Sequence, residues 1–175
     1  MYALFDAWEG VLDFIGQGGD VLIAIAILIF IMWTLIFERI WFFKVSLGRE
    51  VDAALNAWEA RNERKSKRAH QVREALISRV SEKINESMPM INTLVALAPL
   101  FGLLGTVTGM ISVFEIMAIT GGGDAKSMSA GVSKATIPTM SGMVAAISGV
   151  FGYTYLERIS NREKRLLEDH LTMDH

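Results

Sequence analysis

A continuous apolar run at residues 21–37 constrains this chain more than any other feature of its sequence. It reads VLIAIAILIFIMWTLIF, and Thr34 is the only polar residue among its 17 positions. As an α-helix, such a run spans about 26 Å at ~1.5 Å per residue, close to the hydrocarbon thickness of a bilayer. Trp41, Phe42 and Phe43 follow it, and aromatic residues in this place predict a belt at one membrane surface. We therefore expect a first transmembrane helix over residues 20–43.

Two further apolar stretches follow, at residues 91–119 and 130–156. The chain is 51% hydrophobic and still 21% charged, so apolar and charged residues are segregated along it. The two later stretches are rich in glycine, threonine and serine, which suit helices that pack on other helices or face a cavity. The pattern predicts an all-α membrane protein with three transmembrane helices, the second and third being long and extending into the cytoplasm.

The distribution of basic residues predicts the orientation of these spans. The first 20 residues contain no Lys or Arg and residues 120–129 contain only Lys126, whereas residues 39–83 contain eleven basic residues. Basic residues gather on the cytoplasmic side of spans, and their absence from the N-terminal segment argues against a cleavable signal peptide. The predicted order is a periplasmic amphipathic segment (1–19), the first span (20–43), a cytoplasmic helical segment (44–90), the second span (91–119), a periplasmic loop (120–129), the third span (130–156) and a cytoplasmic helical tail (157–175).

Several classes of function are disfavoured by the same sequence. The net charge of −2 argues against a nucleic-acid partner, and the absence of cysteine excludes thiol chemistry. Residues 120–127 (TGGGDAKS) lack both glycines that a phosphate-binding loop requires. All three histidines lie in the predicted aqueous segments, without metal-ligand spacing. We expect no enzymatic activity, no cofactor and no metal.

The polar residues inside the second and third spans are the candidate functional residues. Thr106 and Thr139 fall near the middle of their spans, so antiparallel helices would place them at similar depth. They either bond back to carbonyls of their own helices or form a hydrated seam that faces a pore. Small residues on the same two spans predict close helix packing; these are Gly102, Gly105, Gly109, Gly142 and Gly149.

Two ionisable residues, Glu115 and Lys134, lie towards the predicted outer ends of the second and third spans. A charge within a membrane needs a partner or access to water. These two side chains either pair with one another or extend to the outer surface, near the entrance of any pore.

The stretches APLFGLLGTVTGM (98–110) and AGVSKATIPTMSGMVAA (130–146) resemble the MotA/TolQ/ExbB proton-channel family, and within it the short ExbB-type members. The resemblance implies a homo-oligomer, a pentamer whose second and third spans line a central pore. It also implies an ExbD-type single-span partner that carries a titratable aspartate, and a TonB-type energy transducer. Thr106 and Thr139 match the family's pore-lining threonines, whereas Lys134 stands where a glutamate is expected.

The function implied is that of a pore-forming subunit of a proton-driven motor in the bacterial inner membrane, serving transport across the outer membrane. The spans themselves contain no Asp or His, so this chain would house the carboxylate of its partner. Two alternatives stay open: a TolQ-like motor subunit that serves envelope integrity, and a non-conducting membrane scaffold.

Overall fold

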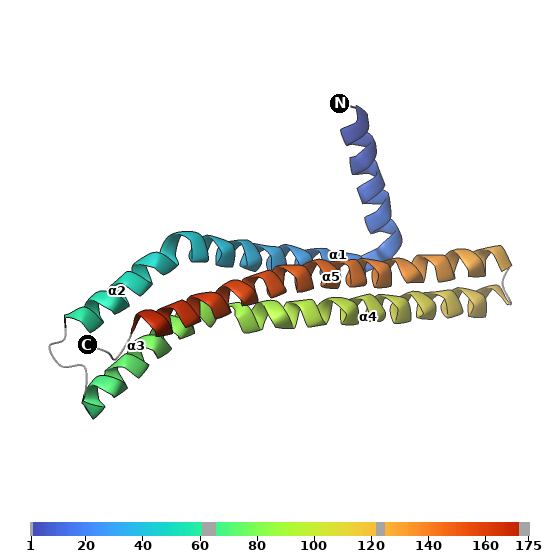
Figure 1. Cartoon of the computed structure of the whole chain (residues 1–175). Helices are drawn as coiled ribbons and strands as arrows, with labels where there is room; N and C mark the ends of the chain where they lie inside the picture. Colours follow the sequence, from blue (N-terminus) through green and yellow to red (C-terminus); the bar gives the residue numbers. More distant parts are fainter. Residues whose placement is uncertain (1, 61–65, 122–124, 172–175) are drawn as a thin grey trace. The chain divides into compact units, whose positions relative to one another are not determined.

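The computed structural model describes residues 2–60, 66–121 and 125–171, with side chains except at 2–18, 120, 125–127, 130 and 134. Every regular element in this part of the chain is helical (Figure 1). The elements are α1 (Tyr2–Trp41), a π-helical turn η1 (Phe42–Ser46), α2 (Leu47–Glu59), α3 (Lys67–Asn85), α4 (Met88–Thr120) and α5 (Ala125–His170).

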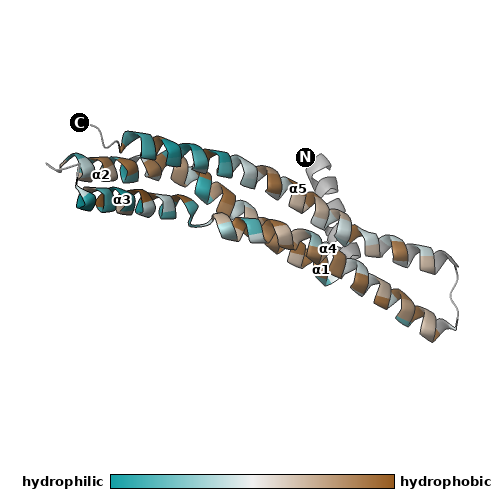
Figure 2. Ribbon diagram, turned by 60° about the horizontal axis from the view of Figure 1, so that its bottom comes forward, coloured by the Kyte–Doolittle hydropathy of each residue, from teal (hydrophilic) through white to brown (hydrophobic). Residues whose placement is uncertain are grey.

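Three of the helices are long and apolar enough to cross a membrane. Figure 2 shows many hydrophobic residues along the coloured part of α1, along α4 and along the middle of α5, and hydrophilic residues along α3 and the end of α5. The predicted all-helical fold with three long apolar helices is therefore confirmed. The apolar helix α4 begins at Met88, after a turn that separates it from α3, whereas α5 continues unbroken for 46 residues.

Contacts divide the chain into two compact units, to both of which α1, α4 and α5 contribute. The first comprises Met1–Trp33 and Thr93–Val150, and the second comprises Thr34–Asn92 and Phe151–His175. In the first unit, α1 is interrupted at Gly19, whose φ of 66° and ψ of −163° a side chain would disfavour. The core of this unit joins all three long helices; its buried residues are Ile25, Leu28, Ala98 and Ala145.

The second unit has a core of its own, built from one face each of α2, α3 and the end of α5. Its buried residues are Leu47, Ala54, Trp58, Ala69, Val80, Ile84, Leu167 and Leu171. α3 begins at a side-chain cap, because the hydroxyl of Ser66 accepts a hydrogen bond from the backbone N–H of Ala69 at 3.2 Å. Lys164 and Ser160 of α5 donate to the Oδ1 atom of Asn85, at 2.8 and 3.2 Å, so polar contacts also join α3 to α5.

Arg39 is buried in the second unit, with an exposed fraction of only 1%. Its guanidinium donates to the carbonyl of Lys83 at 2.7 Å and to the hydroxyl of Ser87 at 2.9 Å, and lies 4.8 Å from the ring centre of Phe42. The last carbonyls of a helix have no donor within that helix. Arg39 therefore caps the end of α3, a role that counting it among the basic residues of its segment did not predict.

Candidate functional site

The candidate site lies in the first unit, where α4 packs against α5 in antiparallel orientation. The seam between these helices is built from three small residues on each, at the same spacing of three and then four positions. On α4 these are Gly102, Gly105 and Gly109, and on α5 they are Ala135, Pro138 and Gly142. Because each set spans seven positions, Gly102 meets Gly142, Gly105 meets Pro138 and Gly109 meets Ala135 across the antiparallel seam.

The glycines allow an approach that no side chain would permit. A Cβ atom placed on Gly142 would lie 2.5 Å from the carbonyl oxygen of Ala98 and 3.0 Å from the Cα atom of Gly102. A Cβ on Gly109 would lie 2.7 Å from that of Ala135, and a Cβ on Gly105 would overlap the ring of Pro138. The backbones of α4 and α5 are thus in direct contact along the seam.

Gly149, the fifth glycine of the predicted packing set, serves a different contact. A Cβ atom on it would lie 2.5 Å from the sulfur of Met32 in α1 and 2.6 Å from a methyl group of Val95 in α4. Gly149 therefore lies where α5 meets both other long helices of this unit.

The structure brings the two predicted threonines to the same level of the seam. The hydroxyl of Thr139 donates across the helix boundary to the carbonyl of Gly102 at 3.0 Å. In an α-helix, that same carbonyl accepts the backbone N–H of Thr106, four residues later. The side chain of Thr106 donates to the carbonyl of Leu103 in its own helix at 2.7 Å. Of the two alternatives for the threonine hydroxyls, Thr106 thus adopts the bond within its own helix, whereas Thr139 bonds to the other helix.

The chemistry available at this level is that of hydrogen-bond orientation. Both hydroxyl protons are engaged, so each oxygen keeps lone pairs that can accept from water or from a protonated carboxyl group. Both threonines are half-exposed, and exposed apolar side chains surround them on the outside of the subunit; these are Leu103, Val107, Met140 and Met143. A threonine hydroxyl does not titrate in the working range of a cell, so a travelling proton needs another carrier.

Glu115 and Lys134 do not share the level of the threonines. Glu115 is exposed on α4. Lys134 lies in α5 one residue before Ala135, which contacts Gly109, and its side chain lies outside the described part of the chain. The register therefore places the backbone of Lys134 near residue 110, about 7.5 Å along the helix from Glu115 at ~1.5 Å per residue. Their pairing stays a prediction.

Pro138 and Ala135 are the members of the seam that sequence reasoning missed. A proline inside a helix removes one backbone bond, which leaves the carbonyl of residue 134 without its usual donor. The signal was present in the sequence, since Ala135, Pro138 and Gly142 repeat the spacing of the three glycines on α4. Among the described residues, no group of three or more His, Asp or Glu side chains could hold a metal ion.

Comparison with known proteins adds a family match. Residues 44–169 match the model of the MotA/TolQ/ExbB proton channel family. Putative biopolymer transport protein ExbB-like 1 of Synechocystis sp. is 34% identical over 93 residues, which are 51% of this chain and 37% of that protein. Tol-Pal system protein TolQ of Pseudomonas aeruginosa is 33% identical over 96 residues, covering 55% and 40%.

A third relative, biopolymer transport protein ExbB of Helicobacter pylori, is 35% identical over 78 residues, which are 45% of this chain and 54% of that protein. In these three cases, the similarity covers from 37% to 54% of the relative's length.

Proposed function

Since the chain belongs to the MotA/TolQ/ExbB proton channel family, we propose that it is the pore-forming subunit of a proton-driven motor in the bacterial inner membrane. Members of this family are channel-type motor subunits and not enzymes. The observation that carries the proposal is the common level of Thr106 and Thr139 within helical segments that contain no charged residue. Residues 88–114 and 135–156 contain no charged side chain, while the hydroxyl of Thr139 donates to the carbonyl of Gly102, about one turn before Thr106 on α4.

The proposed subunit does not carry the proton itself. A relay across the membrane needs a titratable group whose change of charge is tolerated at that depth, and the two long apolar segments offer none. In the proposed complex, an ExbD-type partner inserts a single helix whose aspartate takes a proton from the outer side and releases it inwards as the helix turns. Thr106 and Thr139 would orient water or that carboxylate, since their oxygens accept hydrogen bonds.

The proposed assembly is a homo-oligomer, a pentamer around a central pore. In the second candidate span, only 22% of the most apolar stretch is buried within the chain itself. In the third candidate span, the buried share of the most apolar stretch is 28%. The seam between α4 and α5 therefore has apolar surface on its outside for neighbouring copies and lipid. In this proposal, the N-terminus is periplasmic and the C-terminus cytoplasmic, as the basic residues indicate.

Glu115 and Lys134 are proposed to line the outer entrance of the pore. A lysine stays charged unless it is strongly desolvated, and a fixed positive charge repels protons more readily than it relays them. Lys134→Met should therefore weaken assembly or change pore access more than it abolishes transport. Complete loss of transport with normal assembly would instead make Lys134 part of the relay.

We propose an ExbB-like role with a TonB-type transducer, which energises transport across the outer membrane. A TolQ-like role in envelope integrity is the second candidate, because the relatives include proteins of both names. Deletion of the gene distinguishes them: loss of energised uptake with an intact envelope supports the first role, and detergent sensitivity with normal uptake supports the second.

Threonine variants of the assembled complex test the proposed pathway. Thr106→Val and Thr139→Val preserve the side-chain shape and remove the hydroxyl, so proton flux into proteoliposomes should fall severalfold while the oligomer survives. Thr108→Val is the matched control, because it removes a hydroxyl that bonds within α4 as that of Thr106 does, to the carbonyls of Leu104 and Gly105 at 3.1 Å. Two positions along a helix place Thr108 about 200° around α4 from Thr106, on a different face. Unchanged flux in both test variants would leave the two threonines with packing roles alone.

A further inference from the structure

An exposed face of the second unit follows the end of the apolar run and is not used by the proposed proton pathway. Trp41 at the end of α1 is 71% exposed. The two aromatic residues after it behave differently: Phe42 and Phe43 are half-buried against the core, with their ring centres 6.0 Å apart. Of the three residues of the predicted aromatic belt, only Trp41 presents its ring to the surroundings.

The π-helical turn η1 decides which residue of α2 continues the face of Trp41. A π-turn holds about one residue more than an α-turn, so the residues after it are set back by about 100°. The face that carries Phe37 and Trp41 therefore continues through Val45 to Arg49, where an uninterrupted α-helix would present Gly48. Phe37 and Val45 are 62% and 50% exposed.

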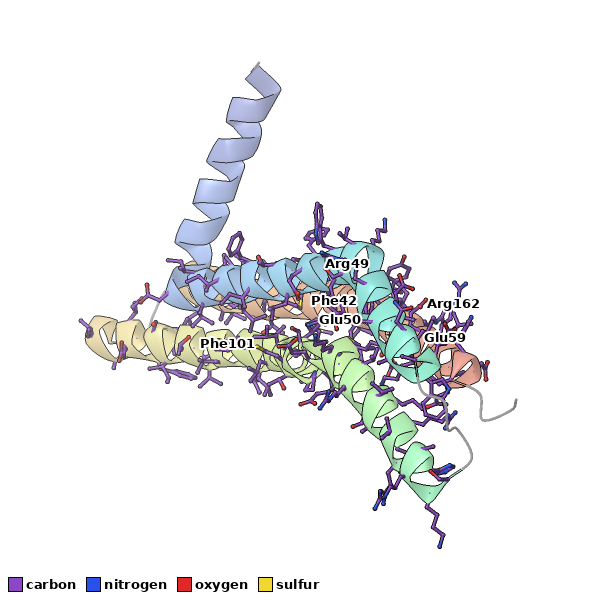
Figure 3. All side chains as sticks on the ribbon, turned by 90° about the vertical axis from the view of Figure 1, so that its left-hand side faces the viewer. Phe42, Arg49, Glu50, Glu59, Phe101 and Arg162 are labelled. Carbon is purple, nitrogen blue, oxygen red and sulfur yellow. The ribbon has the colours of Figure 1, made fainter. Side chains whose placement is uncertain are left out.

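The buried residues of both helices agree with this register. On α1, Ile36 and Arg39 are buried, and Trp41 lies on the opposite side of that helix. On α2, Leu47 and Ala54 are buried, and Arg49 is directed away from them. Figure 3 shows Arg49 at the bend where α2 follows α1.

This face carries positive charge that the described part of the chain does not neutralise. Lys44 and Arg49 are exposed, and within residues 2–60, 66–121 and 125–171 neither has a carboxylate within 4.0 Å. Of the nearby acids, Glu50 accepts from Lys83 at 2.6 Å and Glu38 lies 3.5 Å from Arg39. Asp52 follows Arg49 by three positions and is exposed, but it makes no ion pair within 4.0 Å with either cation. Lys44, one position before Val45, and Arg49 thus follow the exposed indole of Trp41 along the chain, without a carboxylate within 4.0 Å in the described residues.

We propose that Trp41, Lys44 and Arg49 form a binding site for the headgroup of an anionic phospholipid in the leaflet that meets the end of the first span. The phosphate would lie between the two cations, which anionic membrane surfaces attract. The indole would occupy the boundary between headgroup and acyl chain, where tryptophan is enriched. Phe37 and Val45 offer apolar surface to the acyl chain, which favours a lipid over a free phosphate ion or an acidic peptide.

Native mass spectrometry of the full chain tests this site, in mild detergent with equimolar phosphatidylglycerol and phosphatidylcholine. We expect the wild-type chain to retain phosphatidylglycerol preferentially. Each cation removed should reduce this preference about fivefold, so Lys44→Gln/Arg49→Gln should reduce it roughly thirtyfold. Lys44→Arg/Arg49→Lys should keep the preference, because the charges remain. The assay contains no partner and no proton gradient, so its outcome is independent of the proposed motor function.

Two controls make the result specific. Arg162→Gln/Arg165→Gln removes the same charge from the exposed side of α5, where Figure 3 shows Arg162 directed away from the helices; it should leave lipid retention unchanged. Inorganic phosphate at the same concentration should not displace the lipid. Equal retention by wild type and Lys44→Gln/Arg49→Gln, an equal loss in the α5 control, or displacement by phosphate would overturn the proposal.

Discussion

Replacing Gly142 by alanine tests the close contact between α4 and α5 in its most constrained place. The new Cβ atom would lie 2.5 Å from the carbonyl oxygen of Ala98, whereas close C···O contacts between helices are about 3.3 Å. The helices would have to separate locally by roughly 0.8 Å. The contacts are with backbone atoms of α4, so no side-chain rotation can relieve them.

The expected cost follows from two opposing effects. Over-packing of a tight contact costs about 1–3 kcal/mol, and a gap of this size removes a quarter to a half of the dispersion energy of the neighbouring contacts. Alanine in place of glycine inside a helix contributes about 1 kcal/mol in the opposite direction. We therefore expect Gly142→Ala to lower the free energy of unfolding by up to about 2 kcal/mol.

Gly48→Ala is the matched control, because beyond its chain neighbours and the backbone of its own helical turns no described atom lies within 4 Å of the position its Cβ would occupy in α2. That variant gains only helix propensity and should be more stable than the wild type by up to about 1 kcal/mol. Unfolding in detergent micelles by added SDS, followed by circular dichroism, measures both. If Gly142→Ala proved as stable as Gly48→Ala, the tight packing of α4 on α5 would be refuted.

Three further predictions follow from the second unit, the charge pattern and the proposed assembly. Arg39→Gln removes two charged hydrogen bonds at the end of α3 and should lower the free energy of unfolding by about 2–4 kcal/mol, with faster amide hydrogen exchange at residues 83–87. The control Arg162→Gln should change the free energy of unfolding by less than about 0.5 kcal/mol. Equal effects of the two variants would contradict the capping role of Arg39. The chain has no cysteine, so single cysteines can be introduced for labelling from the periplasm. A cysteine at position 124 should be labelled and one at position 65 should be protected. The reverse pattern would overturn the predicted membrane orientation. Native mass spectrometry should detect a homo-oligomer. A predominantly monomeric protein in several detergents would contradict the proposed pore.

The three long helices were predictable because uninterrupted apolar runs leave few alternatives in water or lipid. The common level of Thr106 and Thr139 was also predictable, since a short connection makes the two helices antiparallel. Sequence could not say that Thr139 bonds to Gly102, because this depends on the register between α4 and α5. That register follows from the small residues on either side of Pro138, which span the same length of helix as the three glycines of α4. The match becomes visible only when the two helices are compared with each other.

The second unit was less predictable, for a different physical reason. Its charged residues indicated a solvated helical segment, and nothing in a list of basic residues separates a buried arginine from an exposed one. Arg39 is buried because it finds the carbonyl of Lys83 and the hydroxyl of Ser87, which are more than 40 positions away in the sequence. The π-turn after it likewise has no clear sequence signal, although it changes which residue follows the face of Trp41.

In the proposed motor, this chain houses a proton carrier that a partner supplies. Decay of a pH gradient in proteoliposomes tests it directly, with this protein alone, with the complete complex, and with a complex whose partner aspartate is changed to asparagine. We expect flux only in the complete complex, because residues 88–114 of α4 and 135–156 of α5 contain no charged side chain. Substantial flux from this chain alone would contradict it.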